Sequence, residues 1–249
     1  MARSRPRPCN LSLPEDIVDI RSRLDRVRAR IARAALAASR QPTDIRLVAV
    51  SKTFGLDRIR AAAAAGQEDF GENRVQEALQ KMSESADFLV RWHLIGSLQT
   101  NKARKAAERF AWIHSVDSPD LLRRLDVAAT AAATRPRLLV QVDLAGETTK
   151  HGATLAALPS IFEAAVSCRS AQVVGLMVLP PWFEDPQRTR PYFRQLRELR
   201  DQLRDQGVPS EMLRELSMGM SHDFEVAVEE GATIVRVGTA IFGTRTQKA

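Results

Sequence analysis

Hydrophobic and polar positions along the chain form two alternating patterns. Short runs rich in Val, Ile and Leu alternate with longer stretches in which apolar residues recur every three or four positions. The short runs are typical of buried β-strands, and the longer stretches are typical of amphipathic helices. We predict strands at residues 45–51, 68–71, 90–95, 111–116, 137–143, 172–178, 213–217 and 233–238.

Helical patterns occupy the segments between these strands. We predict helices at residues 56–65, 73–85, 100–109, 118–132, 154–167, 186–206 and 222–230. An uninterrupted alternation of strand and helix implies a parallel sheet. About eight such units in roughly 250 residues fit a closed barrel better than an open sheet. The predicted fold class is therefore α/β, a single (β/α)8 TIM barrel.

One more helical pattern precedes the first strand. It opens at Pro14 and lasts to about Ala38. Its apolar face is formed by Ile17, Ile20, Leu24, Val27 and Ile31. No linker rich in Pro, Gly or Ser divides the chain. We predict a basic, disordered arm at residues 1–12 and a single barrel domain at residues 13–249, with this helix as an N-terminal addition.

The composition, with 44% hydrophobic and 27% charged residues, is typical of a soluble globular protein. Cys9 and Cys168 are far apart in the chain, so they form neither a disulfide framework nor a zinc-binding spacing. The longest apolar run, VVGLMVLPPWF, is too short to span a bilayer. No apolar segment of the secretory type follows the basic N-terminus. These features favour a cytoplasmic protein without a membrane contact.

The net charge of +7 comes almost entirely from the first 40 residues, which contain ten Arg and four acidic residues. A basic segment of this kind can bind RNA or a membrane surface. No aromatic residues are interleaved with the arginines, and no nucleic-acid motif follows. We therefore interpret the segment as a solvated helix with a basic tail and expect no nucleic-acid partner. A nucleic-acid-binding or partner-binding module that uses this segment is an alternative function.

Lys52 ends the first predicted strand, within IRLVAVSKTFG at residues 45–55. Because only six of the 37 basic residues are Lys, a lysine here indicates chemistry that arginine cannot perform. The alternation of Val48, Val50 and Lys52 directs its side chain into the barrel mouth, where active sites of this fold lie. A buried neutral amine there could form a Schiff base with an aldehyde. A lysine that extends along the rim to solvent fits this stretch equally well.

Two turns rich in small residues are predicted after strands seven and eight. SMGMS contributes Ser217, Gly219 and Ser221, and in RVGTAIFG a short helix opens at Gly238 and Thr239. Hydroxyl groups and helix N-termini bind anions, and the loops after these two strands commonly bind phosphate in this fold. Each turn is weak evidence by itself. Together with Lys52 they indicate a ligand with an aldehyde and a phosphate, for which pyridoxal 5′-phosphate (PLP) is the natural candidate.

Six sequence blocks between about Leu47 and Arg245 resemble, in order, the YggS/PROSC family of pyridoxal phosphate homeostasis proteins. They are LVAVSKT, DFGENRVQEALQK, WHLIGSLQTNK, GLMVLPP, LSMGMSHDFEVAVEEG and VRVGTAIFG. The resemblance implies a monomeric barrel like the cofactor domain of alanine racemase (PLP fold type III), without the second β-domain of that enzyme. It implies a role in vitamin B6 and amino-acid homeostasis, with PLP held as a Schiff base, no established catalysis, and PLP-dependent apoenzymes as acceptors.

The resemblance also assigns residues. It makes Lys52 the modified lysine and places Arg236 opposite the pyridine nitrogen and Met177 beside the ring. It puts Lys150 at the rim as a secondary PLP contact. The other cofactor contacts that it implies are Asn73, His93, Ser217, Gly219, Met220, Ser221, Gly238 and Thr239, with Gly96 at the end of strand three. Phe54 is a departure, because many relatives carry a second lysine at that position.

The implied site is that of a carrier more than that of a catalyst. Enzymes that use PLP as an electron sink usually place an acidic group at the pyridine nitrogen, and Arg236 would oppose protonation there. Tyr192, the only Tyr, lies on the helix after strand six, away from the mouth. His93 is the better candidate base, although a structural role is equally consistent with its position. A PLP-dependent amino-acid racemase or lyase is the alternative function, and no metal site is expected.

Overall fold

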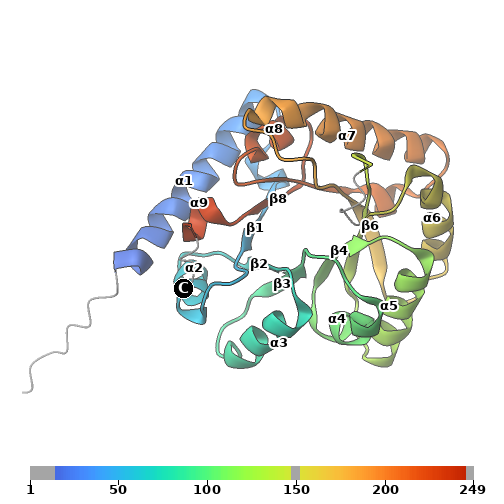
Figure 1. The fold of residues 1–249 in the computed structure, drawn as a ribbon, viewed down its shortest axis with the longest axis horizontal. Helices are drawn as coiled ribbons and strands as arrows, with labels where there is room; N and C mark the ends of the chain where they lie inside the picture. The colour runs from blue at the N-terminus through green and yellow to red at the C-terminus, as the bar shows by residue number, and fades with distance from the viewer. Residues whose placement is uncertain (1–14, 147–151, 245–249) are drawn as a thin grey trace, which may run out of the picture.

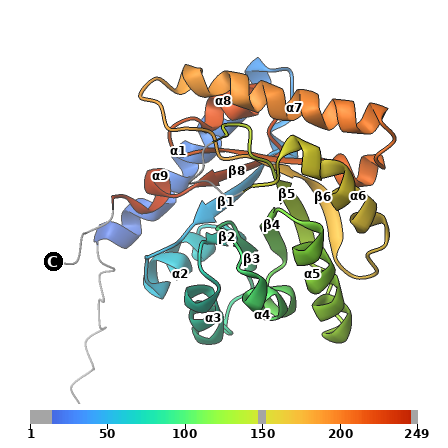
Figure 2. The same ribbon diagram turned by 45° about the vertical axis from the view of Figure 1, so that its right-hand side comes forward.

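Eight parallel strands close into a barrel in the computed structural model, which describes residues 15–146 and 152–244. The strands follow one another around the barrel in chain order, and β8 pairs with β1 to close it. Helices surround the strands on the outside (Figures 1 and 2). The predicted (β/α)8 fold is therefore confirmed, as is the extra N-terminal helix.

All eight strands lie where the hydrophobic pattern predicts them, with small shifts at their ends. They are β1 Arg46–Val50, β2 Asp69–Glu72, β3 Arg91–Leu94, β4 Trp112–Val116, β5 Arg137–Gln141, β6 Gln172–Met177, β7 Glu215–Met220 and β8 Ile234–Val237. The largest difference concerns the seventh, which begins two residues later and ends three residues later than predicted. Its apparent first residue, Leu213, belongs to a 3-10 helix, and SMGM continues the strand instead of forming a turn.

The helices also match the predicted segments. They are α1 Glu15–Ala37, α2 Leu56–Ala64, α3 Val75–Glu84, α4 Ala103–Arg109, α5 Pro119–Ala131, α6 Leu158–Val166, α7 Arg190–Asp205, α8 Phe224–Glu229 and α9 Thr239–Phe242. Three predicted helices begin with a separate 3-10 turn, at Thr100–Lys102, Leu155–Ala157 and Pro186–Thr189. Two other 3-10 turns, Pro42–Asp44 and Ser210–Leu213, lead into β1 and β7.

Helix α1 lies along the outside of the barrel beside α2, α8 and α9 (Figures 1 and 2). Its apolar face is buried from Ile20 to Ala35, whereas the side chain of Ile17 lies outside the described residues. Several of its arginines have structural partners. Arg28 donates to the carbonyls of Ala65 and Gly66 at the end of α2, and Arg30 forms a bidentate pair with Glu225 on α8. Part of the basic surplus therefore fastens this helix to the barrel.

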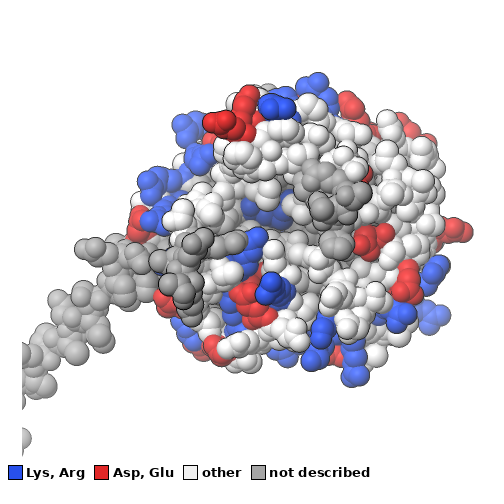
Figure 3. Space-filling model, in the orientation of Figure 1, with Lys and Arg blue, Asp and Glu red and all other residues white. Residues whose placement is uncertain are grey.

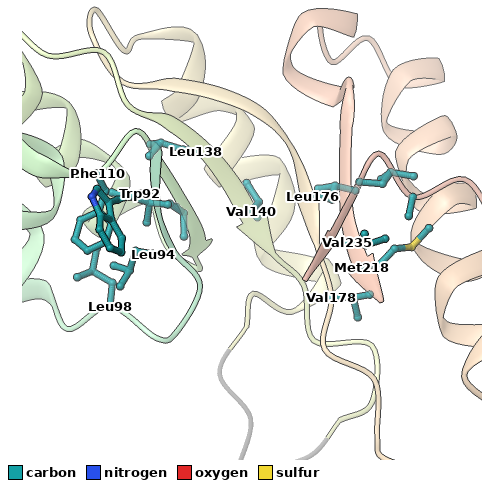
Figure 4. Packing of buried hydrophobic residues seen from close by; sticks show 14 of the residues in the cluster. Trp92, Leu94, Leu98, Phe110, Leu138, Val140, Leu176, Val178, Met218 and Val235 are labelled. Atoms are coloured by element: carbon teal, nitrogen blue, oxygen red, sulfur yellow. The ribbon is translucent and has the colours of Figure 1, made fainter. Parts of the chain in front are cut away.

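Side chains alternate between two buried layers along the strands. Those that point outward, such as Ala49, Phe70 and Leu138, pack under the helices in the larger apolar cluster. Figure 4 shows Trp92, Leu94, Leu98 and Phe110 grouped in this layer beside β3. The inward layer contains a smaller apolar cluster formed by Val48, Trp112, Leu139, Val174, Met177 and Ile234. The barrel interior is thus packed up to its mouth.

The surface carries both signs of charge. Figure 3 shows basic and acidic side chains interspersed around the edge of one face, and basic atoms in a hollow near its middle. Within residues 15–146 and 152–244, no helix is long and apolar enough to cross a membrane. The predicted arm at residues 1–12 lies outside the described part of the chain.

Candidate functional site

A cavity of about 490 Å³ opens at the carboxyl ends of the strands, where active sites of this fold lie. We call it the mouth cavity. Its lining residues are Val50, Lys52, Phe54, Asn73, Ile95, Leu179, Pro180, Trp182, Met220, Ser221, His222, Arg236, Gly238 and Thr239. Among these described residues two, Lys52 and Arg236, are basic and none is acidic, and most of the others are apolar. The cavity is therefore suited to an anionic ligand with a flat apolar body.

Lys52 lies on this cavity directly after β1. Val48 points into the barrel interior, and Val50 and Lys52 line the cavity above it, as the alternation predicts. Phe54 also lines the cavity and packs against Phe242 with ring centroids 5.2 Å apart. Phe54 thus adds an apolar wall to the cavity.

A partly buried ion cluster on the outer side of the strands holds the backbone on both sides of Lys52. Lys81 on α3 pairs with Glu72 at 2.7 Å and with Glu77 at 2.8 Å, and it donates to the carbonyl of Ser51 at 2.9 Å. Glu77 accepts from the N–H of Thr53 at 2.6 Å. Thr53 has a φ of 71°, a conformation that costs energy for a residue with a side chain. We call Glu72, Glu77 and Lys81 the Lys81 cluster.

The two carboxyl groups of this cluster differ in their environment. Burial raises the pKa of Glu72, although Lys81 and the Ser51 hydroxyl donate to its Oε1. Its other oxygen is buried without a hydrogen-bond partner in the described residues. Burial also acts to raise the pKa of Glu77, but hydrogen bonds from Lys81 and Thr53 outweigh it and hold that pKa below its usual value. Glu77 is thus the more firmly ionised partner of Lys81.

Arg236 on β8 forms the inner end of the mouth cavity. Its side chain is buried, with Nη1 2.5 Å from the Ser217 hydroxyl and Nη2 2.9 Å from the carbonyl of Val178. Burial lowers the pKa of this guanidinium to about 10, which still leaves it charged at neutral pH. Two fixed acceptors orient the guanidinium, so it faces the cavity as a rigid donor.

The start of α9 forms another part of the wall. Gly238 precedes this short helix, and its N–H donates to the Ser221 hydroxyl at 3.0 Å. The N–H groups of Thr239 and Ala240 begin the helix and have no intrahelical acceptor, as at every helix start. A Cβ at position 238 would lie 3.2 Å from the Val50 carbonyl oxygen, so glycine allows the close approach of β8 to β1.

The structure brings seven of the predicted cofactor contacts together on the mouth cavity. They are Lys52, Asn73, Met220, Ser221, Arg236, Gly238 and Thr239. Ser217 lies behind Arg236 inside the barrel, and Met177 is packed in the inner apolar cluster. Gly219, with a φ of 90°, faces α8, because a Cβ there would lie 2.6 Å from that of Ala227. Lys150 lies outside the described residues.

His93, the predicted candidate base, is fully buried below the cavity. Its Nε2 lies 2.9 Å from Asp69 Oδ1, and its Nδ1 lies 3.0 Å from His114 Nε2. Both ring nitrogens are therefore used within the barrel, and the structure does not place them on the cavity wall. The physical reason is that the ring stacks on Trp112 and bonds to Asp69 and His114, which hold it within the barrel interior.

Several lining residues are not predicted from the sequence. Trp182, 74% exposed, stands on the loop after β6 and stacks on His222 at 6.1 Å. The Pro-Pro-Trp run after a buried strand is the signal that could have indicated a rigid aromatic wall. Lys81 could have been found by the scarcity of lysine that singles out Lys52. No group of three or more His, Cys, Asp or Glu side chains in the described segments could hold a metal ion.

Comparison with known proteins gives close relatives. The family model described as "Alanine racemase, N-terminal domain" matches residues 22–246. A pyridoxal phosphate homeostasis protein of Aquifex aeolicus is 44% identical over 224 residues, which cover 90% of this chain and 97% of the relative. One of Pseudomonas aeruginosa is 43% identical over 226 residues, which cover 91% of this chain and 96% of the relative.

Solved structures show the same similarity. PipY of Synechococcus elongatus PCC7942, solved with PLP bound, matches with a TM-score of 0.80 at 44% identity, covering 90% of this chain and 100% of PipY. An alanine racemase of Clostridium difficile 630 matches with a TM-score of 0.70 at 13% identity, covering 92% of this chain and 57% of that enzyme. At that identity the racemase shows the fold alone.

Proposed function

This chain belongs to the family of pyridoxal phosphate homeostasis proteins, and we propose that it binds PLP in the mouth cavity through Lys52. The observation that carries the proposal is the meeting of Lys52, Arg236 and the start of α9 on one cavity. These groups come from the segment directly after β1, from β8 and from the start of α9, so the closure of the barrel is what brings them together. The relatives bearing this name, and the PLP bound to PipY, support the assignment.

The chemistry of the cavity fits this ligand. A primary amine, a guanidinium, backbone N–H groups and two hydroxyls provide donors, and Val50, Ile95 and Leu179 provide an apolar wall. PLP has an aldehyde, a flat aromatic ring and a phosphate, and each finds complementary groups here. The chemistry that PLP supplies when bound is that of its aldehyde, which condenses reversibly with a primary amine and releases water.

Each of these residues then has a separate role. Lys52 supplies the amine, and the Lys81 cluster fixes the backbone that carries it. Ser221, Gly238 and Thr239 would hold the phosphate at the start of α9. Arg236 would donate to the pyridine nitrogen, and Trp182 would shield the open side of the ring. Moving the Arg236 side chain would break its buried hydrogen bonds to Ser217 and to the carbonyl of Val178. The loss of these bonds costs free energy, which holds Arg236 in this position.

Holding and release of PLP, in place of turnover, is the function that this arrangement supports best. A guanidinium at the pyridine nitrogen opposes its protonation, which weakens the electron withdrawal that PLP enzymes use. His93, the candidate base, has both ring nitrogens engaged by Asp69 and His114. Tyr192 lies on α7 and stacks on Phe183. These two side chains therefore do not provide an acid and a base that could remove the α-proton of an amino acid and return it.

Reductive trapping tests the binding proposal. The purified protein is mixed with PLP, its visible spectrum is recorded, and borohydride is added to fix the linkage before peptide mapping. We expect a yellow protein and a label on the peptide that contains Lys52. Lys52→Ala should lose both signals, whereas Lys105→Ala, which removes an exposed lysine on α4, should keep both. An unchanged spectrum for Lys52→Ala would show that another lysine carries the ligand.

We further propose that the protein is a cytoplasmic monomer that passes PLP to apoenzymes. Light scattering of the eluted protein tests the monomer. Mixing the PLP-loaded protein with an apoenzyme, in the presence of a phosphatase that destroys free PLP, tests direct transfer. Activation that survives the phosphatase indicates transfer within a complex, and activation that disappears indicates release into solution first.

A further inference from the structure

A line of hydrogen-bonded side chains runs through the barrel interior and ends at Arg236. Its members are Asp69 on β2, His93 on β3, His114 on β4, Ser217 on β7 and Arg236 on β8, and we call them the polar chain. The successive distances are 2.9 Å from Asp69 to His93, 3.0 Å to His114, 2.9 Å to Ser217 and 2.5 Å to Arg236. All five side chains are buried. The polar chain therefore crosses the barrel from the amino end of β2 to the mouth cavity.

The Arg236 end is consistent with one direction of the bonds. A guanidinium only donates, so the Ser217 oxygen accepts from Nη1. The single hydroxyl proton of Ser217 is then available for His114, if Nδ1 of that ring is unprotonated. A neutral His114 with an unprotonated Nδ1 carries its proton on Nε2, and that proton points at His93 Nδ1.

The Asp69 end, with neutral imidazole rings, fixes this direction. Arg91 donates to both oxygens of Asp69 at 2.8 Å, and Arg46 lies 3.3 Å from one of them. Burial alone would raise the pKa of Asp69, but the hydrogen bonds from Arg91 and His93 hold it well below its usual value. The carboxylate is thus an acceptor, and His93 donates to it from Nε2, which leaves its Nδ1 to accept. Both ends assign one proton to each bond without conflict.

Packing keeps the two imidazoles neutral and in place. The His93 ring stacks on Trp112 at 5.4 Å with an interplanar angle of 5°, and it meets His114 edge to face. Burial lowers the pKa of His93 and holds the pKa of His114 well below its usual value. With neutral rings, every proton of the polar chain is used once, and none of its bonds is left without a donor.

We propose that Asp69, His93, His114 and Ser217 are positioning residues that hold Arg236 in one orientation for the PLP ring nitrogen. The polar chain makes the Ser217 oxygen a fixed acceptor, because the proton of that hydroxyl is committed to His114. Arg236 therefore keeps Nη1 on Ser217 and cannot turn away from the cavity. The consequence for PLP rests on the proposed function, whereas the directed polar chain itself does not.

Nitrogen NMR of the apoprotein tests the polar chain without PLP. Long-range 1H–15N spectra separate the two neutral imidazole tautomers and the charged form. We expect His93 and His114 to be neutral, each with its proton on Nε2. A proton on Nδ1 of either ring, or a charged ring at neutral pH, overturns the proposed direction. This NMR measurement uses the unaltered protein, so it does not require any variant to fold.

Two matched pairs of variants test the positioning role. Ser217→Ala removes the acceptor of Arg236, and Ser115→Ala removes a buried β4 hydroxyl that has no partner in the described residues. We expect the Kd for PLP to rise about tenfold in the first, the equivalent of one buried hydrogen bond to a charged group, and to be unchanged in the second. Equal affinities of the two variants would overturn the role.

The second pair changes the Arg236 end. Arg236→Glu places a carboxyl group at this end, and the bonds of the polar chain are then satisfied only if one extra proton is taken up, either by that carboxyl group or by one imidazole. Arg236→Gln retains a donor and requires no such change. We expect the first variant alone to carry the extra proton, which carbon and nitrogen NMR locate, and an ionised carboxylate beside two neutral rings in a folded Arg236→Glu protein would overturn the proposal. Absence of PLP binding by the unaltered protein would overturn the proposed function but leave these NMR results standing.

Discussion

Lys81 on α3 donates a hydrogen bond to the carbonyl of Ser51, with its Nζ 2.9 Å from the oxygen. Ser51 directly precedes Lys52, and Thr53, which directly follows it, is held by Glu77. One turn of α3 thus positions the backbone on both sides of the amine in the mouth cavity. The lysine that would react is fixed by a second lysine that lies outside the cavity, on the other side of the strands.

Lys81→Met should destabilise the protein by about 3 kcal/mol, because removal of one partner leaves the buried Glu72 uncompensated. It should also weaken PLP binding, since Ser51 loses its backbone contact. Urea denaturation and a spectrophotometric PLP titration measure the two effects, with Lys105→Met as the exposed control. The double variant Lys81→Met/Glu72→Gln should recover part of the stability. A Lys81→Met protein that binds PLP with unchanged affinity would show that the Lys81 cluster serves the fold alone.

Gly219→Ala should cost more stability than Gly66→Ala. Both glycines have a positive φ, 90° and 78°, so each substitution pays roughly 1 to 2 kcal/mol for the backbone conformation. Only at Gly219 would the new Cβ meet other atoms, 2.6 Å from Ala227 Cβ and 2.9 Å from Phe224 Cα. Thermal denaturation of the pair isolates the effect of this crowding. Similar losses in the two variants would indicate that β7 can move away from α8 freely.

Asp69→Asn should lower the free energy of unfolding by roughly 2 to 3 kcal/mol at pH 7, because it removes a buried carboxylate that accepts hydrogen bonds from the partly exposed Arg91 and from His93. The pKa of Asp69 is depressed in the folded state, so its stabilisation is complete above the ordinary aspartate pKa of about 3.9 and declines as the pH falls below it. The difference in the free energy of unfolding between the unaltered protein and Asp69→Asn should therefore be constant above about pH 5 and become smaller at acid pH.

Asp87→Asn is the matched control for this measurement. Asp87 also pairs with an arginine, Arg60, but both side chains are about half exposed, at 59% and 45%. An exposed pair of this kind is screened by water and contributes little to stability. Urea denaturation of both variants between about pH 2 and pH 7 checks the prediction. A difference for Asp69→Asn that stays constant down to the acid end of this range would mean that the pKa of its carboxyl group is not depressed in the folded protein.

The strand and helix order could be predicted because each element carries its own periodicity. A parallel barrel strand buried on both sides appears as a short apolar run, as in β1, and the helices show an apolar face of their own. β7 differs because its small residues, Ser217 and Gly219, resemble a turn in sequence. In the barrel, the Ser217 side chain points inward and belongs to the polar chain. Gly219 lies where β7 comes close to α8, with no room for a side chain.

The site could be predicted only in part. Lys52, Arg236 and Gly238 lie at strand ends, and closure of the barrel is enough to bring strand ends together. The Lys81 cluster and the polar chain depend on which side chains meet between elements that are distant in sequence, and no local pattern encodes this. His93 shows most clearly what the sequence does not predict. Its polar side chain at a strand end suggests a functional role, but the structure buries it fully in the barrel interior.

Trp182 should report occupation of the mouth cavity. It is 74% exposed, whereas Trp92 and Trp112 are 7% and 2% exposed, so acrylamide should quench the emission of Trp182 far more than that of the others. Bound PLP would cover one side of its ring and reduce this quenching. Trp182→Phe should leave an emission that acrylamide hardly quenches, with or without PLP. Unchanged quenching after PLP saturation would place the ligand away from Trp182.

Deuterium exchange at the α-carbon separates a carrier from a catalyst. The PLP-loaded protein is incubated with D- or L-alanine in D2O, and mass spectrometry follows the incorporation of deuterium. We expect exchange far slower than one per second, the lower limit of typical enzyme turnover. Arg236 would oppose protonation of the pyridine nitrogen, and both ring nitrogens of His93 are engaged. Arg236→Glu favours protonation of that nitrogen and should raise the slow exchange, whereas Arg236→Gln should raise it less. Exchange at one per second or faster by the unaltered protein would identify it as a racemase-like enzyme, and the carrier function would then be wrong.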